Sequence, residues 1–368
     1  MLATEISKAA AAESALRESL SHLPPFRLQA EKRLLHFRRP ARTSRGELIE
    51  RPVILIRAQS GERESLGECS LMPGLSPEAD TLDDAKLEAA LRTVEAQQAL
   101  RPEQFSSTPA LRFGIEGALL GLLSPTAALW DTPFTRQEQD IDIHHLIWMD
   151  KAPAMLAAMR EGARAGARCL KLKIGALPLA DELAMLRDIR AEFTDIEIRV
   201  DANGAFSPAA ALPVLHELAA IGVACIEQPI APGRRQDMSA LCRCSPLPIA
   251  LDEELIAATT RPEREQLLDL IHPQALVIKP SLHGGLSGAA QWARLADERG
   301  ISWWINSALE SHIGHSLLTQ WCGLTAPERL HGLGTGKLFT DDTLRDIELR
   351  GHRLHWKIYT GKPRASVV

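Results

Sequence analysis

The fold is decided by one stretch of the chain, Leu170-Lys171-Leu172-Lys173-Ile174-Gly175. Its apolar residues alternate with two lysines, and the side chains of a strand point alternately to its two faces. A strand here would turn its apolar face toward helices and present Lys171 and Lys173 together on the other face. Ionisable residues near the end of a buried strand are typical of a (β/α) barrel, whose active site lies at the carboxyl ends of the strands.

Apolar runs and helical stretches alternate on both sides of this strand. The runs cover residues 144–148, 169–174, 196–202, 224–227, 248–253, 275–280 and 302–308, with a weaker eighth at 330–333. The helical candidates between them are 152–165, 180–193, 208–221, 261–270, 286–299 and 312–322. This alternation implies parallel strands joined by right-handed crossovers. We therefore predict an α/β fold, a modified (β/α) TIM-type barrel over residues 141–340, with an open doubly wound sheet as the alternative.

The residues outside the barrel predict a second module. Residues 26–140 contain three strand-like runs, at 31–39, 52–58 and 65–70, followed by helical patterns at about 80–100 and 109–123. This order indicates an α+β capping domain. Residues 1–25 are expected to form a helical N-terminal extension, and residues 341–368 a C-terminal tail that returns to the capping domain.

Composition limits the classes of partner. The chain of 368 residues, 45% of them hydrophobic, suffices for a barrel of about 250 residues and a smaller domain. A net charge of −5 with scattered basic residues argues against nucleic acid or an anionic membrane surface as the partner. We find no apolar segment of about 18 residues for a membrane span. The six cysteines lack zinc-ligand spacing, so reduced thiols and a cytoplasmic location are expected, and a homo-oligomer is compatible with the sequence.

Ionisable residues recur at the carboxyl ends of successive predicted strands. Lys173, Asp201, Glu227, Asp252 and Lys279 are separated by 28, 26, 25 and 27 residues, about one βα unit at each step. All five side chains should therefore surround the same end of the barrel.

Three converging carboxylates, Asp201, Glu227 and Asp252, would repel one another in a partly dry site unless they held a cation. Their oxygen atoms suit Mg²⁺, with Mn²⁺ as the alternative. Lysines on both sides would then bracket a small-molecule carboxylate substrate. The positive charge of Lys171, together with that of the metal, favours a neutral Lys173 that can act as a base.

These residues, as they stand, resemble the enolase superfamily and, within it, the muconate lactonizing enzyme subgroup. The resemblance covers nearly the whole chain after about residue 28. It implies that Lys173 is the acid and base, that Lys171 is its neighbour and that Lys279 is the lysine on the opposite face of the substrate. It also implies that the three carboxylates are the Mg²⁺ ligands.

Further motifs resemble the o-succinylbenzoate synthase family of menaquinone biosynthesis. They lie at residues 43–46, 67–70, 73–76, 226–230, 279–282, 307–311 and 331–336. The resemblance implies a lyase that dehydrates 2-succinyl-6-hydroxy-2,4-cyclohexadiene-1-carboxylate to 2-succinylbenzoate by syn β-elimination. Lys173 would remove the proton next to the carboxylate, giving a metal-stabilised enediolate, and would then protonate the departing hydroxyl group. The first 25 or so residues have no counterpart in that family.

Other residues are candidates for substrate binding or for support of the site. Asn203 shares a strand face with the aspartate of the third strand, and Glu253 follows that of the fifth. Ser307 is expected to contact a substrate carboxylate, and the resemblance places Arg45 in a loop that covers the pocket. His283, which the family pattern does not lead us to expect, is predicted to face solvent, with the pocket as the alternative.

Two competing functions remain open. The same lysines could act as two bases on opposite faces of one carbon, as in racemases or epimerases of N-succinylamino acids or dipeptides. Loss of Lys279 would then abolish proton exchange on one face only, whereas dehydration would weaken without that asymmetry. The other alternative is a metal-binding barrel that serves as a non-catalytic scaffold, although the complete set of carboxylates and lysines argues against it.

Overall fold

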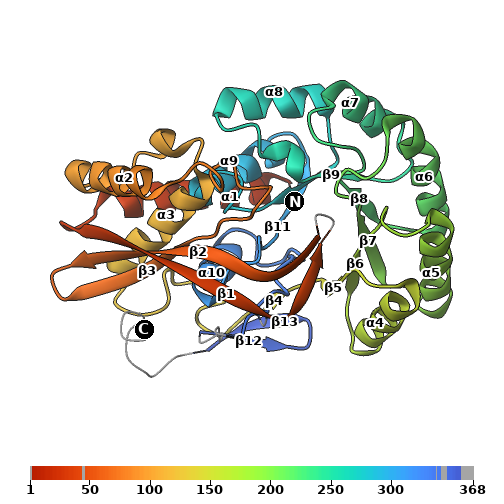
Figure 1. Cartoon of the computed structure of the whole chain (residues 1–368), viewed down its shortest axis with the longest axis horizontal. Helices are drawn as coiled ribbons and strands as arrows, with labels where there is room; N and C mark the ends of the chain where they lie inside the picture. Colours follow the sequence, from red (N-terminus) through yellow and green to blue (C-terminus); the bar gives the residue numbers. More distant parts are fainter. Residues whose placement is uncertain (1, 44–45, 337, 341–345, 358–368) are drawn as a thin grey trace.

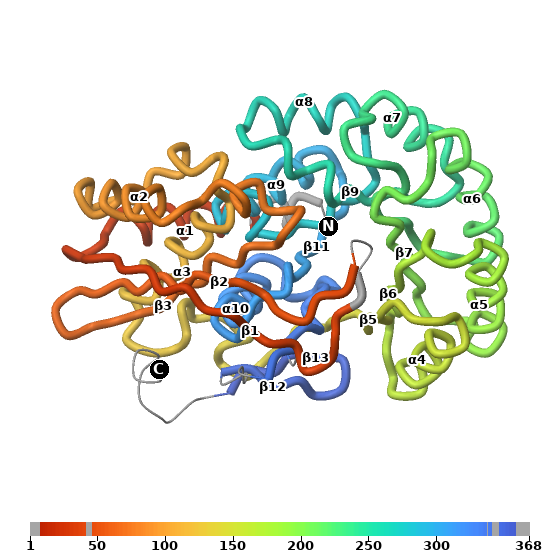
Figure 2. The backbone as a smooth tube through the Cα atoms, in the orientation of Figure 1, coloured from red at the N-terminus to blue at the C-terminus, as the bar shows by residue number. Residues whose placement is uncertain are grey.

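The structure, a computed structural model, describes residues 2–43, 46–336, 338–340 and 346–357. Figure 1 shows an antiparallel β-meander with its helices on one side of the molecule and a curled parallel sheet, covered by helices, on the other. The Cα tube in Figure 2 shows that the chain forms the meander before it winds around the curled sheet. Among the described residues, no helix combines the length and the apolar character that crossing a membrane requires.

The meander consists of β1 (Arg27–Thr43), β2 (Gly46–Ser60) and β3 (Arg63–Cys69), paired in that order. Two helices accompany it, α2 (Asp84–Gln97) and the buried α3 (Pro109–Leu123), with the short 3-10 helix η1 (Pro102–Phe105) between them. Helix α3 packs directly on the backbone of β3. A Cβ atom on Gly67 would lie 1.8 Å from the carbonyl oxygen of Gly114, so only glycines permit this approach.

The barrel sheet contains seven strands, all parallel, in the described part of the chain. They are β5 (His145–Ile147), β6 (Cys169–Lys173), β7 (Glu197–Asp201), β8 (Cys225–Glu227), β9 (Ile249–Leu251), β10 (Ala275–Ile278) and β11 (Ser302–Ile305). Each strand pairs with the next one in sequence. A doubly wound sheet would reverse its strand order at a switch point, so this alternative is excluded.

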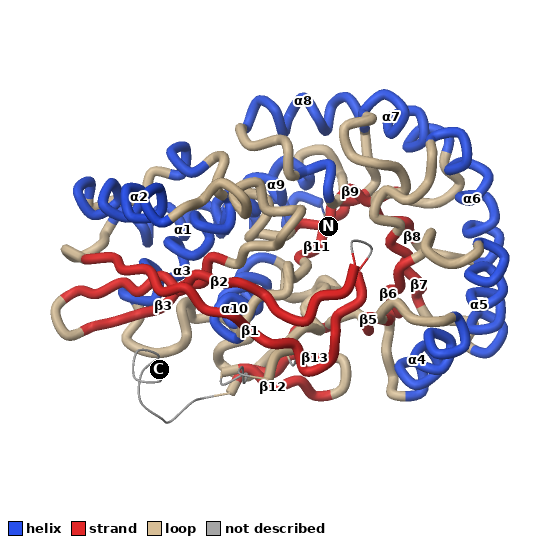
Figure 3. Tube along the Cα trace, in the orientation of Figure 1, coloured by secondary structure: helices blue, strands red, loops and turns tan. Residues whose placement is uncertain are grey.

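Helices cover the outer face of this sheet (Figure 3). They are α4 (Ala152–Arg164), α5 (Leu179–Glu192), α6 (Pro208–Ile221), α7 (Arg235–Cys244), α8 (Arg261–Ile271), α9 (Gly285–Asp297) and α10 (His312–Thr325). The short 3-10 helix η2 (Glu253–Leu255) follows β9. The positions predicted from the sequence are confirmed for six of the seven helices, and α7 was not predicted.

The predicted eighth strand is reduced to two bridges. His331 bridges to Ile143 just before β5, and Gly332 bridges to Asn306 just after β11, so this segment lies between the first and last strands. A Cβ atom on Gly332 would lie 1.9 Å from Oδ1 of Asn306, so the close approach again requires glycine. The sheet is therefore closed by a short segment in place of a full strand.

Both ends of the chain pack against other parts of the molecule. Helix α1 (Leu2–Ser21) packs against α9 and also contacts α10 and α3, burying Ala9, Ala12 and Leu16. Near the other end, β12 (Ile347–Arg350) and β13 (Arg353–Trp356) form a hairpin that pairs with β4 (Ile141–Asp142), at the start of the barrel. In the described part of the chain, the segment before this hairpin contacts the meander through a bridge between Phe339 and Phe37.

The core divides along the faces of the barrel sheet. The largest apolar cluster lies between the strands and the outer helices and includes Trp303. A smaller cluster of inward-facing residues contains Cys225, Val277 and Trp304. The two tryptophans therefore face opposite sides of β11. All six cysteines are free thiols, and five of them, among them Cys169 and Cys225, are buried.

Candidate active site

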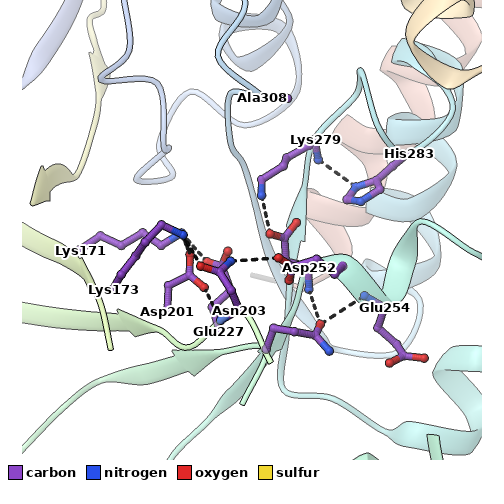
Figure 4. A network of polar contacts seen from close by, with 12 residues as sticks. Lys171, Lys173, Asp201, Asn203, Glu227, Asp252, Glu254, Lys279, His283 and Ala308 are labelled. Atoms are coloured by element: carbon purple, nitrogen blue, oxygen red, sulfur yellow. Dashed lines mark hydrogen bonds and ion pairs between the residues drawn. The ribbon is translucent and has the colours of Figure 1, made fainter. Parts of the chain in front are cut away.

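The six predicted charged residues converge at the carboxyl ends of β6 to β10 (Figure 4). Lys173, Asp201 and Glu227 are register partners across β6, β7 and β8, so the sheet itself places them in a row. Asp252 and Lys279 follow directly after β9 and β10. The strand pairing thus gathers the charged groups that the regular spacing predicted.

Lys171 lies between two carboxylates. Its Nζ atom is 2.5 Å from Oε2 of Glu227 and 3.3 Å from Oδ2 of Asp201. Burial alone would lower the pKa of Lys171, but these carboxylates outweigh it and raise the pKa above its ordinary value. Lys171 therefore acts as a permanent ammonium group inside the barrel.

Lys173 reaches farther toward the mouth of the barrel than Lys171. Its side chain is 20% exposed, against 6% for that of Lys171. Its Nζ atom lies 3.6 Å from Oδ2 of Asp201 and donates a hydrogen bond to Oδ1 of Asn203. Of the two lysines on β6, Lys173 is therefore the one placed to meet a substrate.

Lys279 approaches from the other side of the carboxylates and donates a hydrogen bond to Oδ2 of Asp252 (Figure 4). Burial would lower the pKa of Lys279, but Asp252 and Glu227 raise it above its ordinary value. Burial would likewise raise the pKa of Asp252, but Lys279 holds it below the ordinary value. The pair is therefore ionised.

Asn203 links the lysine side of the site to Glu253. Its Nδ2 atom donates to Oε1 of Glu253 at 2.9 Å, while its Oδ1 atom accepts from Lys173. Asn203 has a φ of 44°, in the left-handed region that asparagine tolerates better than most residues. Asn203 therefore joins Lys173 and Glu253 in one hydrogen-bonded group.

The oxygen atoms available in this cluster fit a hard cation. Oε1 of Glu227 and Oδ1 of Asp252 are buried and accept no hydrogen bond from any described residue. Within the described ranges, no group of three or more acidic, histidine or cysteine side chains forms a ready-made ligand cluster, and lysines pair with the three carboxylates. Carboxylate oxygens without a hydrogen are the ligands that Mg²⁺ prefers.

The prediction that His283 faces solvent is wrong. Its side chain is buried, and Nδ1 accepts a hydrogen bond from the backbone N–H of Lys279 at 2.9 Å. The chain after Lys279 makes a tight turn, in which the backbone N–H of His283 donates to the carbonyl oxygen of Lys279. This turn brings the imidazole back over the strand end.

Ser307 does not offer its hydroxyl group to a substrate carboxylate in the structure. Its Oγ atom donates to Oε2 of Glu310 at 2.6 Å and accepts from Thr335 and from the backbone N–H of Leu309. A hydroxyl has one proton, and this one is already donated. Ser307 therefore supports the loop after β11. Arg45, the other candidate for pocket contact, lies outside the described residues.

Two buried residues that were not predicted also support the site. Oε1 of Gln228 accepts from the backbone N–H groups of Asp252 and Glu254, each at 3.2 Å. Glu310 accepts from Ser281 as well as from Ser307, so it joins the loops after β10 and β11. Both residues stand in stretches that the family motifs contain, but a motif alone does not reveal which backbone groups a side chain holds.

Apolar residues from both modules meet beside the charged cluster. Met72, from the loop after β3, packs with Leu282 and Ala308 from the loops after β10 and β11. Leu75 and Ile256 pack against the same group. The capping module thus supplies part of an apolar wall at the mouth of the barrel.

Comparisons with known proteins agree with this architecture. The family model for the enolase C-terminal domain-like family matches residues 154–352. An o-succinylbenzoate synthase from Desulfotalea psychrophila is 40% identical over 351 residues, which cover 86% of this chain and 95% of that protein. The crystal structure of MenC from the same organism aligns with a TM-score of 0.75 at 36% identity, covering 90% of this chain and 99% of that one.

A likeness to more distant proteins shows the fold alone. The L-Ala-D/L-Glu epimerase of Bacillus subtilis aligns with a TM-score of 0.73 at 16% identity, over 91% of this chain and 97% of that one. The family model covers more than half of the chain, and the synthase from Desulfotalea psychrophila matches almost throughout. The chain therefore belongs to the o-succinylbenzoate synthase family of the enolase superfamily.

Proposed function

We propose that this chain catalyses the Mg²⁺-dependent dehydration of 2-succinyl-6-hydroxy-2,4-cyclohexadiene-1-carboxylate to 2-succinylbenzoate, the reaction that its sequence resemblance implies. The observation that carries the proposal is the placement of Lys173 and Lys279 on opposite sides of three buried carboxylates. The 40% identity to a named o-succinylbenzoate synthase supports this choice of reaction.

In the proposed reaction, Lys173 takes the proton from the carbon next to the ring carboxylate. The C–H bond breaks, a C=C bond forms, and the C–O bond to the hydroxyl on the adjacent carbon breaks. Lys173 then gives the same proton to the departing hydroxyl, so that one water leaves and the ring becomes aromatic. A single lysine can serve both steps because a syn elimination places the proton and the hydroxyl on one face.

The other polar residues bind the substrate, neutralise the negative charge that develops on it and orient Lys173. Lys279, kept as an ammonium group by Asp252, faces the negative charge that develops on the substrate carboxylate. Lys171 supplies a second fixed positive charge next to Lys173. Asn203 fixes the direction of the Lys173 side chain through its hydrogen bond.

Asp201, Glu227 and Asp252 would hold the metal ion. Bound there, Mg²⁺, or Mn²⁺ in its place, would supply positive charge beside the substrate carboxylate. The unpaired oxygens of Glu227 and Asp252 support this assignment. A Glu227→Gln variant should therefore bind Mg²⁺ at least tenfold more weakly by calorimetry, about 1.4 kcal/mol or more.

The test of the reaction is the formation of 2-succinylbenzoate, followed by NMR, with Mg²⁺ and with a chelator. We expect turnover that the chelator abolishes and that Mg²⁺ restores. Wild-type protein that is folded and loaded with metal but makes no 2-succinylbenzoate would contradict the proposal. In that case, N-succinylamino acids and dipeptides in heavy water would test the racemase or epimerase alternative, with Lys279→Ala expected to lose exchange on one face only.

A further inference from the structure

The backbone N–H of Lys279 lies where the barrel sheet ends. The backbone N–H of Asn306 donates to the carbonyl oxygen of Ile278, so the amide of the next residue faces the other neighbouring strand, β9. That strand stops at Leu251, and the chain turns into η2. In the described structure, the sheet therefore provides no carbonyl for this amide, and an amide left unpaired away from water is costly.

The imidazole of His283 takes the place of that missing strand partner. Its Nδ1 atom accepts from the Lys279 amide at 2.9 Å (Figure 4). Because Nδ1 accepts this N–H, it carries no proton of its own, and the bond uses its lone pair. The side chain is buried, and water cannot readily replace it.

The position of His283 is itself fixed from two directions. Its backbone N–H donates to the carbonyl oxygen of Lys279 at 2.9 Å, which closes one turn between the two residues. Its carbonyl oxygen accepts from Nη2 of the buried Arg264 on α8 at 3.2 Å. Lys279 and His283 thus hold each other through two hydrogen bonds, and α8 anchors the pair.

We infer that His283 is a positioning residue for Lys279, holding the lysine backbone so that Nζ points at Asp252 and the substrate position. The inference rests on the role proposed for Lys279. His283 holds the backbone amide of the residue that carries the lysine side chain, Lys279. A shift of this backbone would therefore move the ammonium group. We propose that His283 acts through its hydrogen bonds with the Lys279 backbone.

The test compares His283→Leu, which removes the acceptor, with His283→Asn, whose Oδ1 atom occupies the place of Nδ1. We expect the leucine variant to lose about 10- to 100-fold in kcat while KM changes by less than about twofold, because a misplacement near 1 Å has effects of this size. The asparagine variant should recover most of the lost kcat. If the leucine variant does not fold, His283→Gln replaces it, since glutamine carries its oxygen one bond too far from the backbone.

A double-mutant cycle with Lys279→Ala separates positioning from general damage. Without the lysine ammonium, His283→Leu should change kcat by less than about twofold, since there is no group left to position. His331 provides the matched control, because its Nδ1 atom also accepts a buried strand amide, that of Ile305, at 3.1 Å. In the double variant, the fold loss in kcat caused by His331→Leu should multiply with the fold loss caused by Lys279→Ala.

Hydrogen exchange of the Lys279 amide gives a readout that does not need turnover. We expect slow exchange in the wild type and the asparagine variant and faster exchange in the leucine variant. Unchanged exchange, an unchanged kcat in folded His283→Leu, or an equal loss in the Lys279→Ala background would each overturn the inference. A wild type without dehydratase activity would overturn the proposed function, and the exchange rates would still decide whether His283 holds the backbone.

Discussion

Lys171 and Lys173 stand two residues apart on one strand, yet their surroundings give them different tasks. Lys171 is enclosed by Glu227 and Asp201, whereas Lys173 is more exposed and is held by the side chain of Asn203. A buried ammonium group that two carboxylates surround cannot easily give up its proton. We therefore propose Lys173, the more exposed of the two, as the acid and base. Its hydrogen bond to Asn203 would fix the direction of its side chain.

Removing the Asn203 side chain should weaken catalysis without unfolding the protein. We propose Asn203→Gly, because glycine tolerates the φ of 44° at this position. The expected result is a fall in kcat of about 10- to 100-fold, the cost of a poorly oriented catalytic group. Steady-state kinetics and circular dichroism check it, and a folded variant with the kcat of the wild type would show that Asn203 does not orient Lys173.

Buried carboxylates accept hydrogen bonds from backbone N–H groups of the loops and helix starts around the mouth of the barrel. Glu182 on α5 accepts from the backbone N–H groups of residues 175–177, directly after β6. Glu254 accepts from the N–H of Gly233 in the loop after β8. From the capping module, Glu116 holds the start of α9 and Glu68 the start of α10. The loops next to the catalytic groups are therefore held by charge-assisted hydrogen bonds.

The Glu182→Gln variant tests this arrangement at the loop after Lys173. An amide has one acceptor oxygen in place of two and no charge, so the free energy of unfolding should fall by about 1.5–3 kcal/mol. Glu192→Gln on the same helix is the control, because Glu192 forms an exposed ion pair with Arg160 and its loss should cost less than about 1 kcal/mol. Urea unfolding measures both, and equal stabilities of the two variants would refute the role given to Glu182.

The closure of the whole barrel depends on the short segment between its first and last strands. His331 in that segment is buried, with Nδ1 accepting from the N–H of Ile305 and Nε2 donating to the carbonyl oxygen of Ala326 at 2.9 Å. Burial lowers the pKa of His331 to about 4. A protonated ring would lose the bond to Ile305, which links the segment to the last full strand of the sheet.

The stability of the protein should therefore depend on pH through His331. The unfolded chain protonates this histidine below its ordinary pKa of about 6.5, whereas the folded chain does so only near 4. Its contribution is complete above pH about 6.5 and falls by about 3 kcal/mol as the pH decreases to about 4. In His331→Asn, which has no group to titrate, the free energy of unfolding should decrease less over this interval. An equal decrease in the free energy of unfolding of the wild type and His331→Asn over this interval would contradict the assignment.

Regular features of the site could be predicted from the sequence, and contacts made by turns could not. The ring of charged residues follows from the βα repeat, which places Lys173, Asp201 and Lys279 at equivalent points of successive units. The position of His283 depends on the turn after Lys279, and nothing in the sequence around it distinguishes a ring folded back from one in solvent. The contacts of Ser307 could not be predicted either, because its partner, Glu310, accepts the same proton that a substrate would need.

We propose that Lys173 carries the proton in the formation of 2-succinylbenzoate. The most direct measurement is the rate of this reaction at saturating Mg²⁺ for the wild type, Lys173→Ala and, as a control, the exposed Lys151→Ala. We predict a loss of about 10²- to 10⁴-fold or more for Lys173→Ala, the usual contribution of a general base, and no change for the control. A folded, metal-binding Lys173→Ala enzyme that retains the rate of the wild type would contradict the account.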